Sequence, residues 1–323
     1  MSTSTDLSIG YLIPTREAIM SDQPETGPLL ELADRADRLG YASAWVGDSL
    51  VARPRHEPLT MLTAIAARTE SMIVGTAVLI PVLRHPVVMA HQVATLDRIA
   101  EGRLVLGVGI SANTPAAHAE FETAGITFER RVGRFNDHLA LCRKLWSGEP
   151  VTHDGPFYSV ENATIGPSAH SPGGPPLWIA GSTPPSLKRA AARYDGWMPI
   201  DPVDTYEASW ATLQDEARAA GRNPGDISPS AYLTVSLDED AEVADQTLTD
   251  FLGTYYSPAP PAVMRKMQAC YAGPRNGLTA WVAEFVKSGA QHLILRFAGA
   301  HEDHLEQCSN LKSDVLSHLE TVA

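Results

Sequence analysis

Residues 101–113 read Glu-Gly-Arg-Leu-Val-Leu-Gly-Val-Gly-Ile-Ser-Ala-Asn, and this stretch decides the fold. The apolar, partly β-branched run at 104–108 indicates a buried strand, and the small residues after it let a ligand approach the backbone closely. The letters also match a dinucleotide fingerprint, Gly-x-Gly-x-x-Ala, at Gly107, Gly109 and Ala112. A nicotinamide-binding fold opens with this fingerprint, whereas three strand–helix units precede it here. We therefore keep nicotinamide binding only as a minor alternative.

The composition is that of a folded protein with a large core. Of 323 residues, 44% are hydrophobic and 20% are charged. The 25 Lys and Arg residues against 38 Asp and Glu residues give a net charge of −13. Such an acidic chain is a poor partner for nucleic acid or an anionic membrane surface. The composition therefore favours a protein that acts on small molecules.

Three features bear on the compartment. Cys142, Cys270 and Cys308 are far apart and odd in number, which fits a reducing environment better than a disulfide framework. Residues Met1 to Leu7 do not combine a basic region with an apolar run, and the chain holds no apolar stretch of membrane-spanning length. We expect a soluble, cytoplasmic protein.

Working outward from the opening stretch, strand-like runs alternate with helical periodicity along the whole chain. The other predicted strands are 7–13, 44–46, 72–80, 177–180, 196–198, 230–237 and 291–297. The predicted helices are 28–40, 57–69, 86–99, 131–146, one that ends at Arg193, 206–220, 241–256, 278–288 and 301–319. Eight such units predict an α/β protein, a (β/α)8 TIM barrel formed by residues 1–323 as a single domain.

Two segments depart from this alternation, after strands 4 and 7. Residues 148–176 contain an Asp154-Gly155 turn between β-prone residues, which predicts a hairpin, followed by a Pro-, Gly- and Ser-rich loop. Residues 257–277 lie between two predicted helices. We expect both segments to be excursions on the barrel that form a mobile lid.

In a TIM barrel the active site lies at the carboxyl ends of the strands. Few residues at the predicted strand ends titrate, and the main exception is Asp48. This pattern favours a planar cofactor that carries the chemistry itself. At one strand end, Gly181-Ser182-Thr183 precedes a helix, so its amides and hydroxyls either bind a phosphate or cap the helix.

Several segments, taken in this order, resemble the bacterial luciferase-like monooxygenase family over nearly the whole chain. They are Ala44-Trp-Val-Gly-Asp48, Gly75-Thr-Ala-Val-Leu79 with His85-Pro86, Gly102-Arg-Leu-Val-Leu-Gly-Val-Gly109, Arg131-Val-Gly-Arg-Phe135, Leu145-Trp-Ser-Gly-Glu-Pro150, Pro176-Leu-Trp-Ile-Ala-Gly181 and Asp195-Gly-Trp197. The resemblance implies a flavin- or deazaflavin-dependent barrel.

The resemblance also implies where the cofactor binds. Its ring is expected near a non-proline cis peptide between Ala77 and Val78, and its phosphate at the ends of the fourth and fifth strands. The expected cofactor-binding residues are Ala77, Val78, Gly109, Ile110, Ser111, Asn113, Ala180, Gly181 and Ser182.

Two positions depart from the family pattern. Many relatives carry His directly after the acidic residue at the end of the second strand, where this chain has Asp48-Ser49. In the deazaflavin-dependent sugar phosphate dehydrogenases a glutamate follows the fourth strand, where this chain has Ala112. His56, on the next loop, is a candidate for the missing imidazole or part of a solvated basic loop. The candidate catalytic residues are Asp48, Ser49 and His56.

We expect a monooxygenase that uses reduced FMN and O2 on a small organic substrate, with the reduced flavin supplied by a separate reductase. The close alternative is hydride transfer with reduced deazaflavin coenzyme F420, and a further alternative is a non-catalytic flavin-binding barrel. Relatives are often dimers, so the resemblance implies a homodimer. We expect no metal site at His301 and His304. Arg131, Arg134 and Arg143 recur at helical spacing and either meet a phosphate tail or lie on a solvated helix face.

Overall fold

The structure, a computed structural model, describes residues 7–322. The expectation that the first residues carry no leader therefore concerns a segment that lies almost wholly outside the described residues. Two compact units make up the chain. Unit 1 consists of the described residues within 1–14, 27–45 and 178–323, and unit 2 of residues 15–26 and 46–177.

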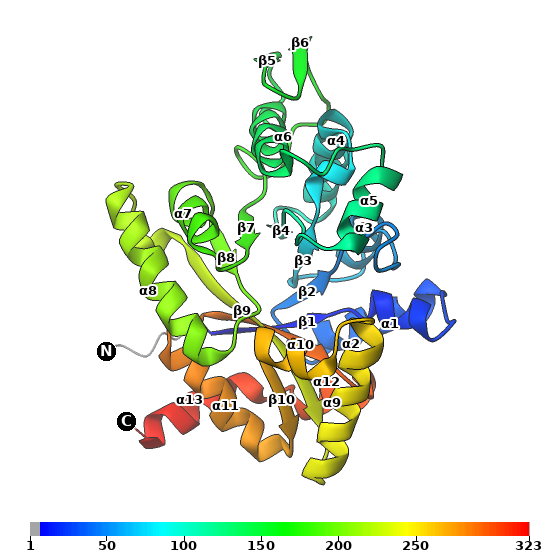
Figure 1. The fold of residues 1–323 in the computed structure, drawn as a ribbon, viewed down its shortest axis with the longest axis vertical. Helices are drawn as coiled ribbons and strands as arrows, with labels where there is room; N and C mark the ends of the chain where they lie inside the picture. Colours follow the sequence, from blue (N-terminus) through cyan, green and yellow to red (C-terminus); the bar gives the residue numbers. More distant parts are fainter. Residues whose placement is uncertain (1–6, 323) are drawn as a thin grey trace. The chain divides into compact units, whose positions relative to one another are not determined.

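Unit 1 contains most of the parallel strands (Figure 1). These are β1 (Ser8–Leu12), β2 (Ser43–Val46), β7 (Leu177–Ala180), β8 (Gly196–Met198), β9 (Ser228–Leu237), β10 (Cys270–Gly273) and β11 (His292–Phe297). They pair in the order β7, β8, β9, β11, β1, β2. The long strand β9 pairs with β8 near its start and with β10 near its end. All residues of β2, β8 and β11 are buried, as expected for parallel strands covered on both faces.

Helices follow the strands of unit 1. They are α2 (Thr26–Arg38), α7 (Pro184–Arg193), α8 (Val203–Ala219), α9 (Ala241–Tyr255), α10 (Pro261–Met267), α11 (Arg275–Lys287), α12 (His301–Gln307) and α13 (Leu311–Val322), with a short 3₁₀ turn η2 (Pro224–Asp226). Local chemistry sets their starts: Pro184 opens α7, and the Asp240 carboxylate accepts from the amides of Glu242 and Val243 at the start of α9.

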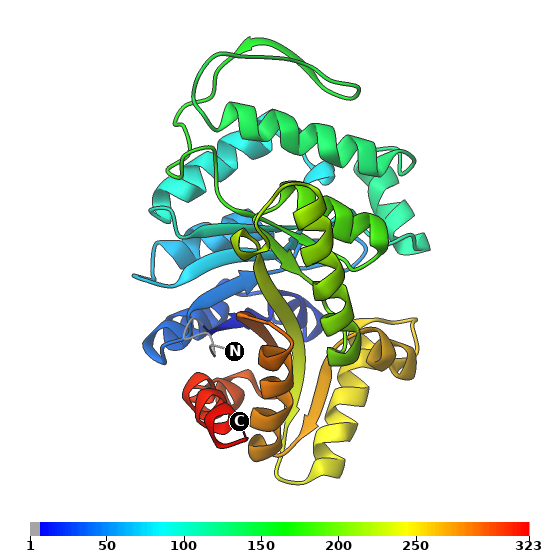
Figure 2. The same ribbon diagram turned by 90° about the vertical axis from the view of Figure 1, so that its left-hand side faces the viewer.

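Unit 2 holds the two remaining parallel strands and a hairpin. Its elements are α1 (Thr15–Met20), α3 (Pro58–Ala66), β3 (Ile73–Leu79), η1 (Pro81–Leu83), α4 (Pro86–Ile99), β4 (Leu104–Val108), α5 (Pro115–Thr123), α6 (Arg131–Leu145), β5 (Val151–Asp154) and β6 (Ser159–Ala163). Strand β3 pairs with β4 in parallel, and β5 pairs with β6 antiparallel. Figure 2 shows the hairpin beyond α6, which β5 contacts.

The eight predicted strands and the hairpin are all present. The sequence did not indicate α1 or α5, and the predicted helix 301–319 is two helices, α12 and α13, with a break after Gln307. Residues 257–277, which we expected to form a lid, contain helix α10 and strand β10, and β10 extends the sheet beside β9. A lid function for this segment stays a prediction.

Candidate active site

In unit 2 the ends of β3 and β4 approach each other closely. The expected cis peptide between Ala77 and Val78 is present in β3. The Gly109 amide donates a 2.8 Å hydrogen bond to the Leu79 carbonyl, and a Cβ on Gly109 would lie 2.8 Å from Val78 Cγ2. Only glycine leaves this space free. The structure therefore brings the expected cofactor residues Ala77, Val78 and Gly109 together.

The loop after β4 carries the other expected cofactor residues of this unit. Ile110 and Ser111 are half-buried, and Asn113 is exposed. Ser111 has φ +69°, a left-handed conformation that few residues other than glycine adopt. The Asn113 side-chain oxygen accepts a 2.7 Å hydrogen bond from His118 Nε2 at the start of α5. The loop is therefore held in an unusual backbone conformation between β4 and α5.

Asp48 is committed to an ion pair. Its buried carboxylate accepts from Arg84 Nη1 at 2.7 Å and Nη2 at 3.0 Å, and from the Ile80 amide at 2.9 Å. Arg84 also bonds Glu57 at 2.8 Å. Although burial acts to lower the pKa of Arg84, its bonds to Asp48 and Glu57 raise it overall. Asp48 thus fixes the end of β3 and has no free oxygen for a substrate proton.

Ser49 is held by a residue that the sequence did not indicate. Its hydroxyl donates to the Oε1 atom of buried Glu120 on α5 at 2.5 Å. The same oxygen accepts the amides of Leu50, Val51 and Ala52 at 2.7–3.2 Å. One carboxylate oxygen therefore organises the loop that follows β2.

Replacing Glu120 by alanine should lower the free energy of unfolding by about 1–3 kcal/mol, because the amides of the 50–52 loop lose a buried acceptor. Urea denaturation gives the change in stability, and hydrogen exchange should quicken at residues 50–52. Glu122→Ala, an exposed change on the same helix, is the matched control and should alter stability by less than about 0.5 kcal/mol. Unchanged exchange in the Glu120 variant would show that another group holds the loop.

His56 faces main-chain oxygens. Its Nδ1 lies 3.2 Å from the Thr15 carbonyl oxygen and its Nε2 lies 2.7 Å from that of Pro24. Both neighbours are carbonyl acceptors, and the shorter contact is that of Nε2 with Pro24. The structure places His56 between two loops, with both ring nitrogens facing main-chain carbonyls.

In unit 1 the expected residues Ala180, Gly181 and Ser182 follow one another at the end of β7. Gly181 has φ +100°, and its carbonyl accepts a 3.1 Å hydrogen bond from Trp197 Nε1. The Ser182 hydroxyl oxygen is buried and has no hydrogen-bond partner among the described residues. A buried hydroxyl without a partner is unusual and indicates a place for a ligand atom.

Asp201 lies three residues beyond β8, next to Ser182. Its Oδ2 atom is buried and has no hydrogen-bond partner in the described part of the chain. Burial raises the pKa of Asp201 above its ordinary value, and the neighbouring Ser182 hydroxyl acts in the opposite direction. The hydroxyl of Tyr206, also buried and unpartnered among residues 7–322, lies near this carboxyl. A carboxyl group at a strand end whose pKa is raised by burial is a candidate acid.

The two histidines considered for a metal each have a partner in unit 1. His301 Nδ1 lies 2.8 Å from the Tyr11 hydroxyl, and His304 Nε2 accepts the Leu237 amide at 3.0 Å. Within residues 7–322, three or more His, Cys, Asp or Glu side chains do not gather in a metal-binding arrangement. No helix in this range is long and apolar enough to span a membrane.

A family model described as luciferase-like monooxygenase matches residues 7–309. The chain belongs to this family. The resemblance inferred from the sequence is therefore confirmed, and this luciferase-like protein is a flavin- or deazaflavin-dependent oxidoreductase.

Three similar proteins are named F420-dependent glucose-6-phosphate dehydrogenases. The one from Kineococcus radiotolerans is 33% identical over 68% of this chain and 67% of that protein. The one from Mycolicibacterium fortuitum is 34% identical over 74% of this chain and 71% of that protein. The one from Mycobacterium tuberculosis is 32% identical over 74% of this chain and 71% of that protein.

Solved structures share the fold of this luciferase-like protein. The monooxygenase RslO1 from Streptomyces bottropensis has a TM-score of 0.80 and 24% identity, over 97% of this chain and 100% of that one. The coenzyme F420-dependent tetrahydromethanopterin reductase from Methanopyrus kandleri also has a TM-score of 0.80. It is 18% identical over 97% of this chain and 99% of that one. The predicted (β/α)8 TIM-barrel fold is confirmed.

Proposed function

We propose that this luciferase-like protein is an F420-dependent oxidoreductase that transfers a hydride to or from a small organic molecule. The observation that carries this proposal is the 32–34% identity to three dehydrogenases named for coenzyme F420, over 68–74% of the chain. It reverses the order of cofactors predicted from the sequence. Reduced FMN was favoured there, and the relatives support the deazaflavin alternative better.

Two observations on the described residues support this proposal. At the ends of β3 and β4, the glycine at position 109 leaves a space beside Val78 that any Cβ would fill. At the end of β7, the buried Ser182 hydroxyl lies beside the Asp201 carboxyl, which suits a polar atom of a bound small molecule. We propose that Val78 and Gly109 contact the ring of the coenzyme.

The chain itself has to handle the proton. Bound reduced coenzyme F420 supplies a hydride, and a carbonyl or imine substrate then needs a proton from the protein. Asp48 is ion-paired with Arg84, Ser49 donates to Glu120, and both nitrogens of His56 face carbonyls. Asp201 has an unpartnered oxygen and a raised pKa. We therefore propose Asp201 as the acid.

Two residues argue against simple transfer of the relatives' sugar phosphate substrate. Ser49 stands where many relatives have His, and Ala112 stands near the place of the glutamate of the sugar phosphate dehydrogenases. The structure fixes Ser49 on Glu120. We therefore propose a small organic substrate other than a sugar phosphate. The separate reductase and the homodimer stay predictions.

Equilibrium binding tests this proposal directly. Oxidised and reduced F420 and FMN are titrated anaerobically into the purified protein, and we expect F420 to bind at least about tenfold more tightly than FMN, a difference of about 1.4 kcal/mol. Gly109→Ala should weaken F420 binding because its Cβ meets Val78. Gly27→Ala, where a Cβ meets nothing within 4 Å, is the matched control.

Each other outcome has a defined meaning. Preferential binding of reduced FMN would restore the monooxygenase prediction, and tight NADPH binding without flavin would restore the nicotinamide alternative. F420 binding without turnover on any tested carbonyl, imine or alkene would favour a non-catalytic barrel. Binding of none of these molecules would overturn the proposed function.

A further inference from the structure

Arg296 is a buried cation near the carboxyl end of β11, in unit 1, and only 1% of its surface is exposed. Earlier on the same face of this strand, the His292 ring contacts Trp45 on β2 and Trp178 on β7. A face that meets side chains of β2 and β7 is the interior face of the barrel. Arg296 therefore points into the barrel at the end where active sites lie.

The partners of Arg296 are all neutral. Its Nη2 atom donates to the Thr234 hydroxyl and to the Gln268 side-chain oxygen, both at 2.7 Å. Its Nη1 atom donates to the Tyr256 hydroxyl at 2.8 Å. Its Cζ atom also lies 4.7–5.3 Å from the ring centres of Tyr232, Phe251, Tyr255 and Tyr256. Among residues 7–322 no Asp or Glu forms an ion pair with it, so this buried cation is short of an anion.

Two buried polar atoms beside Arg296 also lack a partner in the described part of the chain. One is the Gln268 Nε2 atom, whose side-chain oxygen is already bonded to Arg296. The other is the Ser236 hydroxyl, one pleat beyond Thr234 on the same face of β9. We call Ser236, Gln268 and Arg296 the Arg296 cluster. Its unused donors and its charge suit a buried, negatively charged acceptor.

A main-chain hydrogen bond places the Arg296 cluster beside the proposed acid. The Ala269 amide donates to the Ile200 carbonyl at 2.6 Å. Ala269 directly follows Gln268, and Ile200 directly precedes Asp201. All of these residues belong to unit 1. A small molecule bound at the Arg296 cluster is therefore close to Asp201.

We propose that the Arg296 cluster binds a carboxylate of the substrate, so that the substrate is an oxo acid rather than a neutral carbonyl compound. This inference rests on the proposed function and names its substrate class. A carboxylate balances the guanidinium charge and accepts the unused hydrogen bonds of the cluster. The oxo group gains a hydride at carbon and the Asp201 proton at oxygen, which gives a hydroxy acid. Overall, two electrons and two protons pass from reduced F420 to the oxo acid, and the second proton passes through Asp201.

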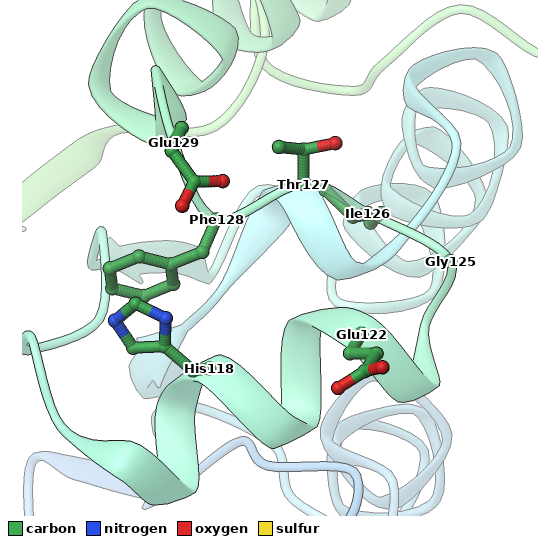
Figure 3. Close-up of a pocket in the computed structure, with 7 residues that line it drawn as sticks. All are labelled: His118, Glu122, Gly125, Ile126, Thr127, Phe128 and Glu129. Atoms are coloured by element: carbon green, nitrogen blue, oxygen red, sulfur yellow. The ribbon is translucent and has the colours of Figure 1, made fainter.

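The pocket beside α5 in unit 2 is a poorer place for a carboxylate. It has a volume of about 350 Å³, and Figure 3 shows Glu122 and Glu129 among its lining residues. Both glutamates are exposed, and their charges repel an anion. The charge of an acidic substrate therefore favours the buried cation in unit 1.

Helix α10 covers the Arg296 cluster. Gln268 directly follows this helix, Met264 of the helix packs in a small apolar group against α9, and Arg265 forms an ion pair with Asp245 at 2.6 Å. The Asp245 side chain is exposed, and a pair of this kind contributes little to stability. We therefore expect α10 to move aside when a ligand enters.

Matched acids and esters test the inference with and without the coenzyme. Pyruvate and levulinate, two oxo acids with different spacing between carbonyl and carboxylate, are titrated calorimetrically into the purified protein beside their methyl esters. We expect at least one acid to bind about tenfold more tightly than its ester. Turnover with reduced F420 should show the same preference in kcat/KM.

The Gln268→Glu variant places a carboxylate of the protein where we expect that of the substrate. Glutamate keeps the shape of glutamine and pairs with Arg296 across the existing 2.7 Å contact. We expect the preference for acids to be lost, while the melting temperature stays at or above that of wild type. Gln291→Glu makes the same charge change at an exposed position directly before β11 and should keep the preference.

The outcomes separate this inference from the proposed function. Equal binding and equal turnover of acids and esters would overturn the inference and leave F420-dependent hydride transfer standing. An unchanged preference for acids in folded Gln268→Glu would also overturn it, because the carboxylate would then bind elsewhere. Preferential binding of an acid, lost in Gln268→Glu, by a protein that does not bind F420 would support the carboxylate site and overturn the proposed function.

Discussion

Replacing Arg84 by methionine should cost about 3–5 kcal/mol of the free energy of unfolding, one of the largest effects expected of any single change in this protein. The side chain of Asp48 is 1% exposed, and Arg84 is its only charged partner in the described ion pairs. Without Arg84 the carboxylate stays buried with only the Ile80 amide as its donor. Urea denaturation monitored by circular dichroism measures the loss, and F420 binding should weaken with it because Asp48 fixes the end of β3.

Two further variants distinguish a buried charge from lost packing. Glu57→Gln removes the second carboxylate bound by Arg84. Because the Glu57 side chain is 40% exposed, this change should lower the free energy of unfolding by less than about 1 kcal/mol. Adding Asp48→Asn to the Arg84 variant should restore part of the stability, because no uncompensated charge then stays buried. A double variant no more stable than Arg84→Met would mean that the loss came from packing.

The strands could be predicted because their sequences repeat one simple pattern. Residues 104–108, 177–180 and 196–198 were predicted with the bounds that the structure has, since short apolar runs end there at glycine, proline or a loop. Helix α5 was missed because its apolar residues are mostly alanine. Strand β10 was missed because Cys270–Gly273 pairs only through β9, far away in the sequence.

Parts of the candidate site that depend on tertiary contacts could not be predicted. Asp48 is visible at a strand end, but its partner Arg84 is 36 residues further along the chain. Glu120 lies in the missed helix α5. Asp201 could have been found from the sequence, since it lies three residues after the strand 196–198. It was missed because we considered only the last residues of each strand, and Met198 is the last residue of this one. A search of three further residues past each strand would have found it.

The proposed coenzyme shows a different limit of sequence reasoning. The net charge of −13 averages over the whole chain and hides local basic regions. Arg131 and Arg134 stand out in the sequence by their spacing, but the stacking of the arginines at the start of α6 on Phe128 and Phe157 is visible only in the structure. Local fields at a site outweigh the average when the charges are close and partly buried.

The Asp201→Asn variant should lower kcat for F420-dependent turnover about 10²–10³-fold, because the carboxyl is the proposed proton donor. The affinity for F420 should not change, since the proposed ring contacts are at Val78 and Gly109. Steady-state kinetics on a substrate found by screening carbonyl compounds with reduced F420 gives kcat, and titration gives the affinity. Asp204→Asn, an exposed change of the same charge three residues away, should leave kcat unchanged.

The pH dependence of stability tests the same carboxyl without any substrate. Because the pKa of Asp201 is raised by burial, its proton stabilises the folded protein at low pH, and this contribution is lost as pH rises through the raised pKa. Near and below the ordinary pKa of about 3.9 the wild type and Asp201→Asn should therefore be similarly stable. At higher pH the variant should become the more stable protein, since asparagine carries no charge to bury.

The Ser182→Ala variant tests the neighbouring hydroxyl. It should raise the pKa of Asp201 further, because the hydroxyl that favours the carboxylate is gone, so the difference in stability should extend to higher pH. Higher stability combined with lower kcat is what a catalytic acid produces, whereas a variant that loses stability at every pH would show that Asp201 serves the fold.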